Sequence, residues 1–186
     1  WKVFREEKKK LKINYPPEHV IDKQIVLKNL QRYKSDSFVM WLDHASFIIK
    51  LGDTTIITDP VFEKNYGPLW FGPKKYVESP LTLKELPEIN LFILSHNHFD
   101  HMSIRTIKNF PYKNAKVLVP LKLGKYFTRN GYKKDNVKEM DWFDKIKIND
   151  EITITMLPAQ HWSKRWIWGD GNTDRSLWGS FLIEYK

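Results

Sequence analysis

Three closely spaced histidines that directly follow an apolar run constrain the fold of this chain more than any other feature. The run Asn90–Ser95 has the continuous hydrophobicity of a strand that is buried on both faces of a sheet. Residues 96–101 then read His-Asn-His-Phe-Asp-His. The sequence therefore predicts a layered domain in which the end of one buried strand carries a dense cluster of polar side chains.

The spacing of these side chains suits metal ions. In extended backbone, residues two apart point to the same side, so His96 and His98 can bind one ion together. Asp100 and His101 lie where the chain turns into a helix, and they can reach a second ion beside the first. Because the chain has no cysteine, the ligands must be imidazole and carboxylate, which suit Zn²⁺ or a similar divalent ion in an open, catalytic site. Surface or helix-capping histidines are the alternative, and the density of the cluster argues against them.

Three residues elsewhere could complete such a site. His161 follows a strand and begins a loop, so together with the cluster it is expected to be the third ligand of the first ion. His44 and Asp59 lie at the ends of two other strands, where they could orient the ligands from behind. An ordinary role in a turn or a helix cap fits His44 and Asp59 equally well.

Two loops, at 60–80 and 158–175, are rich in aromatic residues. These aromatics lie among Gly, Pro and charged residues, which favours a partly exposed apolar wall beside the site over core packing. On the second loop, Trp162, Lys164 and Arg165 could contact a substrate, the two cations by holding an anionic group. Solvated charges are the alternative for each cation. The aromatics concerned are Tyr66, Trp70, Phe71, Tyr76, Trp162, Trp166 and Trp168.

The rest of the sequence mixes short β-type runs with single helices, which predicts an α/β layered domain. Gly52-Asp53 is expected to turn the chain between two strands. Strands are expected at 37–42, 45–51, 54–58, 116–119, near 136–140 and at 177–184, with a hairpin over 146–156. Helices are expected at 1–12, at 103–109 and near 121–130, where Gly131 ends the last one.

Positive charge is concentrated near the start of the chain. The chain has 31 Lys and Arg against 22 Asp and Glu, a formal net charge of +9. Residues 1–34 hold ten of the cations and four of the acids, which places +6 of the +9 there. We therefore divide the chain into a basic N-terminal arm, 1–36, and a domain, 37–186. The arm could contact nucleic acid or anionic lipid, although a solvated helix and a linker explain it more simply.

With these residues identified, the chain resembles the metallo-β-lactamase superfamily. Residues 96–101 match the His-x-His-x-Asp-His motif of that family, here placed after a buried strand. A longer series over residues 38–182 is similar to the branch that contains N-acyl-phosphatidylethanolamine-hydrolysing phospholipase D and its bacterial relatives. The series consists of Trp-Leu-Asp-His-Ala-Ser at 41–46, Thr-Asp-Pro-Val-Phe at 58–62, Gly-Pro-Lys-Lys at 72–75, Ser-Pro at 79–80, Glu-Leu-Pro at 85–87, Val-Pro-Leu at 119–121, Met-Asp-Trp at 140–142, His-Trp-Ser-Lys-Arg at 161–165 and Leu-Trp-Gly-Ser at 177–180.

The resemblance implies an αββα sandwich, built from two similar halves, that binds two zinc ions. The first zinc would be held by His96, His98 and His161, and the second by Asp100 and His101. The resemblance also implies a hydrolase, in which a hydroxide that bridges the two metals attacks phosphorus or a carbonyl carbon. Asp100 and His101 would then be the catalytic residues, because two cations lower the pKa of bound water and stabilise the charge that builds up on the attacked group.

The chain departs from the family pattern in two ways. Asp43 stands where the Trp-Leu-Gly-His element of the family has Gly. In the family, the strand that matches 177–184 is followed by a Gly-Asp-Thr-Gly-like turn, whose Asp bridges both metals, and later by a further His. Neither follows that strand here. We therefore expect residues 1–186 to be a fragment that supplies the first half of the sandwich and binds one zinc or none, with a C-terminal half or a second copy as its partner.

The first functional hypothesis is a zinc-dependent hydrolase of a phosphodiester. An N-acylated phospholipid is the favoured substrate, with contact between the basic arm and a membrane surface. One alternative is a lactonase or other ester hydrolase that uses the same metals, and another is a half chain that binds metal without catalysis. A nucleic-acid binder is disfavoured, because no concentrated basic face lies near the metal ligands.

Overall fold

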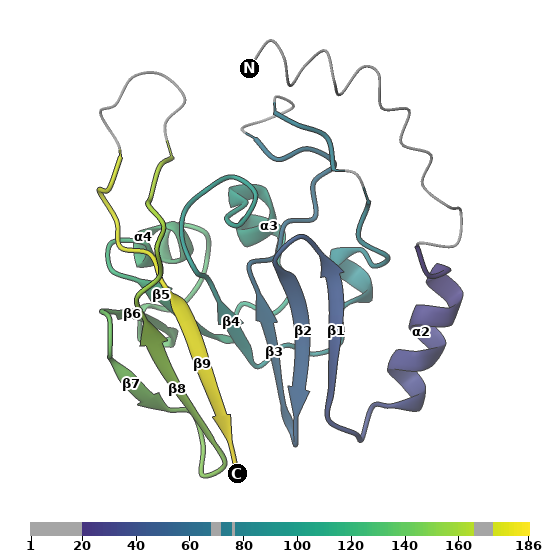
Figure 1. Cartoon of the computed structure of the whole chain (residues 1–186). Coiled ribbons are helices and arrows are strands. Elements are labelled where there is room, and N and C mark those ends of the chain that lie inside the picture. The colour runs from purple at the N-terminus through teal and green to yellow at the C-terminus, as the bar shows by residue number, and fades with distance from the viewer. Residues whose placement is uncertain (1–19, 68–71, 76, 166–172) are drawn as a thin grey trace.

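Two β-sheets with helices beside them make up the described part of this computed structural model, residues 20–67, 72–75, 77–165 and 173–186 (Figure 1). The larger sheet has the strand order β1-β2-β3-β4-β5-β6, and the smaller one has the order β7-β8-β9. The strands are β1 (Phe38–Asp43), β2 (Ser46–Leu51), β3 (Thr54–Thr58), β4 (Leu91–Ile93), β5 (Lys116–Pro120), β6 (Val137–Met140), β7 (Lys145–Lys147), β8 (Ile152–Leu157) and β9 (Ser180–Tyr185). The helices are α2 (Lys23–Arg32), α3 (Ile104–Asn109) and α4 (Gly124–Thr128), with 3₁₀ turns at Leu83–Glu85 and Lys134–Asn136.

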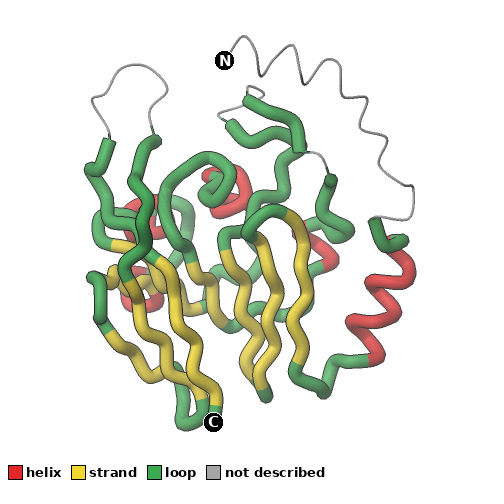
Figure 2. The backbone as a smooth tube through the Cα atoms, in the orientation of Figure 1, coloured by secondary structure: helices red, strands yellow, loops and turns green. Residues whose placement is uncertain are grey.

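The directions of the strands bring distant residues to one edge of the larger sheet. β1, β2 and β3 pair antiparallel, whereas β3 to β6 run parallel to one another. Because parallel strands end at the same edge, Asp59 after β3 and the histidine segment after β4 emerge together. The turn between β1 and β2 at His44 lies at this edge too, since Phe47 of β2 pairs with Thr58 of β3. Figure 2 shows the loops after β1, β3, β4 and β8 gathered along this upper edge.

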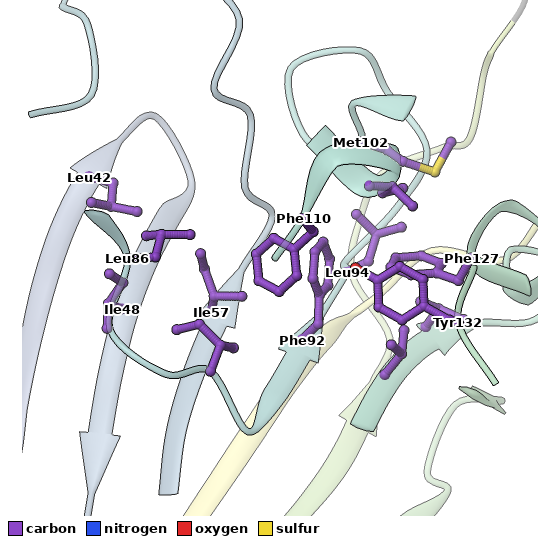
Figure 3. Close-up of a cluster of buried hydrophobic side chains, with 14 of the residues drawn as sticks. Leu42, Ile48, Ile57, Leu86, Phe92, Leu94, Met102, Phe110, Phe127 and Tyr132 are labelled. Carbon is purple, nitrogen blue, oxygen red and sulfur yellow. The ribbon is translucent and has the colours of Figure 1, made fainter. Parts of the chain in front are cut away.

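Each face of the larger sheet contributes to a separate hydrophobic core. On one face, Phe92 of β4 packs edge to face against Phe110, which follows α3, and Phe127 of α4, with ring centroids 5.2 and 5.0 Å apart (Figure 3). On the other face, Leu91 of β4 packs in one cluster with Ile154 of β8. The layers are therefore helices, larger sheet and smaller sheet, which agrees with the predicted α/β class and with the first layers of an αββα sandwich.

Most observed elements lie close to the predicted ones, and three of them differ in their bounds. The last strand begins at Ser180 rather than at 177, because the amides of Leu177 and Gly179 donate to the carbonyl oxygens of Leu121 and Ser95 at the edge of the larger sheet. β4 ends at Ile93 rather than at 95. α4 is also shorter than predicted, at Gly124–Thr128. The predicted turn is confirmed at Gly52, whose φ of 53° costs glycine little.

The structure contains one helix, α2, that the sequence analysis did not predict. It begins at Asp22, whose side chain accepts a hydrogen bond of 2.8 Å from the amide of Gln24. Val26 of α2 is buried in the core, so this part of the predicted arm, 1–36, packs on the domain beside β1. The predicted helix at 1–12 lies outside the described residues. Among the helices that the structure describes, none has the length and apolar character needed to cross a membrane.

Candidate metal centre

Three imidazole rings converge at this edge of the larger sheet. His96 and His98 follow β4, whereas His161 comes from the loop after β8, 65 residues beyond His96. Nε2 of His161 lies 2.9 Å from Nε2 of His96 and 3.2 Å from Nδ1 of His98. These three residues, the first group, present their nitrogens to a common point, as three protein ligands of a metal ion with one open position would.

A second group of ligand atoms lies beside the first and consists of His44, Asp100 and His101. Oδ2 of Asp100 is 3.1 Å from Nε2 of His44 and 4.0 Å from Nε2 of His101. The ring of His101 lies 4.0 Å from the ring of His96, measured between centroids, so the two groups are neighbours. Within each group, the ligand atoms lie within 4.8 Å of one another. The structure thus brings all five predicted metal ligands together, while their binding of metal stays a prediction.

Asp59 and Ser95 make hydrogen-bonding contacts with one histidine of each group. Oδ1 of Asp59 accepts a 2.7 Å hydrogen bond from the amide of Ser95, and Oδ2 accepts one of 2.5 Å from its hydroxyl. The same Oδ2 is 2.8 Å from Nδ1 of His101, and the Ser95 hydroxyl is 2.8 Å from Nδ1 of His96. These contacts leave Nε2 of both rings free to face the ligand groups, as is usual for imidazoles that bind metal. Sequence reasoning anticipated Asp59 in this place but missed Ser95, whose position at the end of the apolar run was the available signal.

Left-handed backbone occurs at two of these positions. The φ angles of His44 and Asp59 are 36° and 39°, a conformation that costs a residue with a side chain about 1 kcal/mol or more. Surrounding contacts hold both residues in place. The indole of Trp41 donates to the carbonyl oxygen of His44 at 3.0 Å, and the hydroxyl of Ser46 donates to that of Asp59 at 2.7 Å. Strain that is maintained in this way is typical of functional sites.

The pKa values of three of these histidines shift in different directions. Burial, followed by the charges of the neighbouring histidines, lowers the pKa of His96 to about 2. Burial is also the main cause that lowers the pKa of His98. At His101, burial alone would lower the pKa, but the hydrogen bond and charge of Asp59, with the charge of Asp100, raise it overall. Since metal ions bind the neutral imidazole, His96 and His98 are ready to bind without losing a proton.

The donor set fits a divalent transition metal. It combines imidazole nitrogens with the carboxylate of Asp100 and contains no thiolate, which suits zinc and other ions that accept nitrogen and oxygen ligands. Nδ1 of His96 is occupied by Ser95, so its Nε2 directs a lone pair toward Nε2 of His161. A cation at this point would satisfy both nitrogens. The residues present therefore fit a bound metal.

Aromatic side chains lie at the open side of the groups. The ring of Trp162 is 4.7 Å from that of His161 and 5.2 Å from that of His98, and 51% of Trp162 is exposed. The ring of Tyr66 lies 5.4 Å from that of His44. These two agree with the predicted apolar wall. The other predicted members, Trp70, Phe71, Tyr76, Trp166 and Trp168, lie outside the described residues.

The two cations predicted to hold a substrate contact the histidine segment itself. The backbone amide of Lys164 donates to the side-chain oxygen of Asn97 at 2.9 Å. The guanidinium of Arg165 donates to the carbonyl oxygens of Asn97 and Met102. Sequence reasoning missed Asn97, because a residue between two ligands carries no signal of its own. Binding of an anionic substrate by Lys164 and Arg165 stays a prediction.

A buried ion pair behind His44 was also missed. Nζ of Lys75 lies 2.5 Å from Oδ2 of Asp43, and the two side chains are 2% and 3% exposed. Lys75 also donates to the carbonyl oxygen of Val61. The pair explains how Asp43 can occupy a position where the family pattern has glycine, because Lys75 balances the buried charge. No pattern in the sequence connects residues that are 32 positions apart in this way.

Comparisons with known proteins agree with this geometry. The family model "Beta-lactamase superfamily domain" matches residues 54–186. N-acyl-phosphatidylethanolamine-hydrolyzing phospholipase D 1 of Caenorhabditis elegans is 30% identical over 177 residues, which cover 88% of this chain and 49% of that protein. A UPF0173 metal-dependent hydrolase of Caldivirga maquilingensis is 29% identical over 125 residues, 67% of this chain and 48% of that protein. The chain spans about half the length, or less, of the curated relatives it matches.

Solved structures share the fold. Igni18, a metallo hydrolase from Ignicoccus hospitalis, superposes with a TM-score of 0.55 at 19% identity, over 79% of this chain and 55% of that one. CmlA, a diiron β-hydroxylase from Streptomyces venezuelae, gives a TM-score of 0.54 at 22% identity, over 82% of this chain and 28% of that one. At these identities the likeness concerns the fold alone. The family model, the curated relatives and the fold together establish that the chain belongs to the metallo-β-lactamase superfamily, in the branch related to N-acyl-phosphatidylethanolamine-hydrolysing phospholipase D.

Proposed function

We propose that the protein is a zinc-dependent hydrolase that cleaves a phosphodiester, with an N-acylated phospholipid as the first substrate to test. The observation that carries the proposal is the adjacency of the first and second groups at one edge of the sheet. Hydrolysis assisted by two metals needs two cation sites a few ångströms apart. The 4.0 Å separation of the His96 and His101 rings, one from each group, is compatible with that requirement.

Zinc is proposed because of the donor set. Three imidazoles with an open position are a common arrangement of catalytic zinc, and the chain has no thiolate to offer. Iron accepts the same nitrogen and oxygen ligands. The metal content of the purified protein therefore distinguishes zinc from iron.

In the proposed reaction, some residues of the chain bind metal and others orient the ligands. Bound metal ions would lower the pKa of a water molecule and polarise the group that it attacks. His96 and His98 remain neutral at ordinary pH and so remain available as ligands. Asp59 orients His101 through Nδ1, and His44 orients the carboxylate of Asp100. With no cysteine in the chain to act as a nucleophile, attack by water is the simplest route.

The phosphodiester is proposed on two grounds. One relative is named for the hydrolysis of N-acyl-phosphatidylethanolamine. In addition, the exposed indole of Trp162 beside the first group offers apolar surface to an acyl chain. A lactone or carboxylic ester would need the same metals, and the name of the relative favours the phosphodiester over it.

A panel of substrates tests the proposal. The full chain is freed of metal with a chelator, reloaded with Zn²⁺ or Fe²⁺, and assayed on N-acyl-phosphatidylethanolamine in mixed micelles, on a chromogenic phosphodiester and on a lactone. We expect the zinc form to release phosphatidic acid and an N-acylethanolamine from the lipid, as water adds to phosphorus and the ester bond to the N-acylethanolamine breaks. The metal-free protein and His98→Ala should be inactive.

Other outcomes would replace the proposal. Turnover of the lactone alone would make the protein an ester hydrolase. Stoichiometric zinc binding without turnover of any substrate would support a chain that binds metal without catalysis. Activity that survives complete removal of metal would overturn the metal-dependent mechanism itself.

A further inference from the structure

Asn97 lies between two ligands of the first group but faces away from them, as alternation along an extended segment requires. It is buried, with 5% of its surface exposed. Its side-chain oxygen accepts a 2.9 Å hydrogen bond from the amide of Lys164, and its side-chain nitrogen donates to the hydroxyl of Ser176 at 3.1 Å. One buried amide thus joins the histidine segment to both arms of the loop that begins at His161.

Arg165, from the same loop, holds the turn that carries the remaining ligands. Its Nη1 donates to the carbonyl oxygen of Asn97 at 3.2 Å and to that of Met102, and its Cζ lies 4.2 Å from the ring centroid of Phe99. The two carbonyl groups lie immediately before and after residues 98–101. A single guanidinium is therefore bonded to both ends of the turn and stacked on its middle.

The described arms of the loop that begins at His161 are also held by contacts with each other and with the larger sheet. Its two arms are joined to each other, since the amide of Ser163 donates to Oδ1 of Asp174 at 3.1 Å and the amide of Asp174 donates to the carbonyl oxygen of Ser163 at 2.8 Å. Beyond the loop, the amide of Gly179 donates to the carbonyl oxygen of Ser95 at 3.1 Å. The contacts of Asn97 and Arg165 therefore join the loop that carries His161 directly to the segment that carries His96 and His98.

We propose that Asn97 and Arg165 form a clamp that positions His161 against His96 and His98, and that this clamp sets the metal affinity of the first group. Neither residue is a ligand, so both are positioning residues that act through the three imidazoles. The inference rests on the metal-binding part of the proposed function and is independent of the substrate. Partners that orient metal ligands typically change metal affinity by about 10- to 100-fold.

The positive charge of Arg165 allows the clamp to be distinguished from two simpler roles of this residue, repulsion of the metal ion and binding of an anionic substrate. A fixed positive charge beside a metal site opposes the binding of a cation. If charge were the only effect, removing it with Arg165→Met would strengthen metal binding. If Arg165 only held an anionic substrate, the same change would raise KM and leave metal affinity unchanged. The clamp predicts the opposite sign from electrostatics, namely weaker metal binding after the repulsive charge is removed.

The experiment measures Zn²⁺ affinity of the full chain by competition with a chromophoric chelator. Asn97→Ala and Arg165→Met are expected to weaken binding at the first group by about 10- to 100-fold. Arg165→Lys keeps the charge but loses the planar guanidinium that stacks on Phe99, so an intermediate loss is expected. Asn29→Ala and Arg32→Met, at exposed positions of helix α2, are matched controls and should bind zinc like the unmodified chain. The visible spectrum of the Co²⁺ form should change in the clamp variants, because the ligand geometry changes.

Each outcome decides the proposal. Unchanged zinc affinity and an unchanged Co²⁺ spectrum in Asn97→Ala and Arg165→Met would overturn it, as would tighter binding in Arg165→Met. Should Asn97→Ala fail to fold, Ser176→Ala removes only the partner hydroxyl and is expected to show a smaller loss of affinity. A chain that binds zinc but hydrolyses nothing would fail as a hydrolase, while the fall in affinity would still support the clamp. A chain that binds no zinc at the first group would overturn both.

Discussion

The first and second groups lie side by side at the same sheet edge, yet they are assembled in different ways. The first group takes two imidazoles from one extended segment and a third from a loop 65 residues further along the chain. The second group takes Asp100 and His101 from one turn and His44 from the turn between β1 and β2. Burial keeps His96 neutral, whereas Asp59 and Asp100 raise the pKa of His101.

This difference predicts which kind of substitution should weaken metal binding at each group. The first group depends on tertiary contacts that bring a distant loop into place, so changes in geometry should damage it most. The second group depends on carboxylates that attract both metal ions and protons, so changes in charge should damage it most. Substitutions that alter one property at a time can test this distinction.

The largest effect is expected from Asp100→Asn. The change preserves the shape of the side chain and removes the negative charge of the second group. Metal-assisted hydrolysis draws several kcal/mol of transition-state stabilisation from the ions, so turnover should fall by about 10³-fold or more. Turnover with zinc and thermal unfolding of the metal-free protein should be measured together. Near-normal turnover in a folded variant would contradict a role for the second group in catalysis.

His161→Ala should produce the next largest effect, in metal affinity. The first group would keep His96 and His98 and lose the ligand supplied by the distant loop. We expect Zn²⁺ affinity at this group to fall by more than about 100-fold, beyond the usual effect of losing an orienting partner. Competition with a chelator measures the loss, and Trp162→Ala is the matched control at the neighbouring position. Equal affinities in the two variants would show that His161 is not a ligand.

The contrast between the two groups also explains which parts of the site could be predicted from sequence. His96, His98, Asp100 and His101 lie within six residues, and the alternation of extended backbone already places His96 and His98 on one side. His161 could only be inferred as a partner, because no local pattern reports contact between segments 65 residues apart. Contacts such as that of Asn97 with Ser176 depend entirely on tertiary structure.

The fold shows the same division between local and long-range information. The strands at the centre of the larger sheet were predictable because runs such as Leu91–Ile93 are apolar throughout and buried. Helix α2 escaped prediction because it packs mainly through Val26, Leu27 and Leu30, while Ile25 remains 52% exposed. A helix with so narrow an apolar stripe and so many cations is hard to distinguish from a solvated segment.

A smaller effect is expected from Asp59→Asn, which tests the support of the second group. The amide would lose the charge that raises the pKa of His101 while keeping the shape of the side chain. Metal affinity at the second group should fall by about tenfold, at the lower end of the range for orienting partners. The pKa of His101 in the metal-free protein, followed by NMR, should decrease. An unchanged pKa would mean that Asp59 does not determine the protonation of His101.

The last prediction compares the groups within a single unmodified chain and concerns the pH dependence of metal release. In the metal-free protein the raised pKa of His101 contributes stability that is present below 6.5 and is lost as the pH rises through the raised value. The lowered pKa of His96 acts in the opposite direction, with stability lost as the pH falls from 6.5 toward about 2.

Protons should therefore compete with metal at His101 before they compete at His96. As the pH falls below the pKa of His101, metal affinity at the second group should weaken by about tenfold per pH unit, while His96 remains neutral. Starting from protein that holds zinc at both groups, stepwise acidification from pH 8 to pH 5, with released zinc measured at each step, should release zinc from the second group while the first group keeps its ion. Simultaneous release at one pH would show that the two groups titrate as a single site and that their different construction has no effect on metal binding.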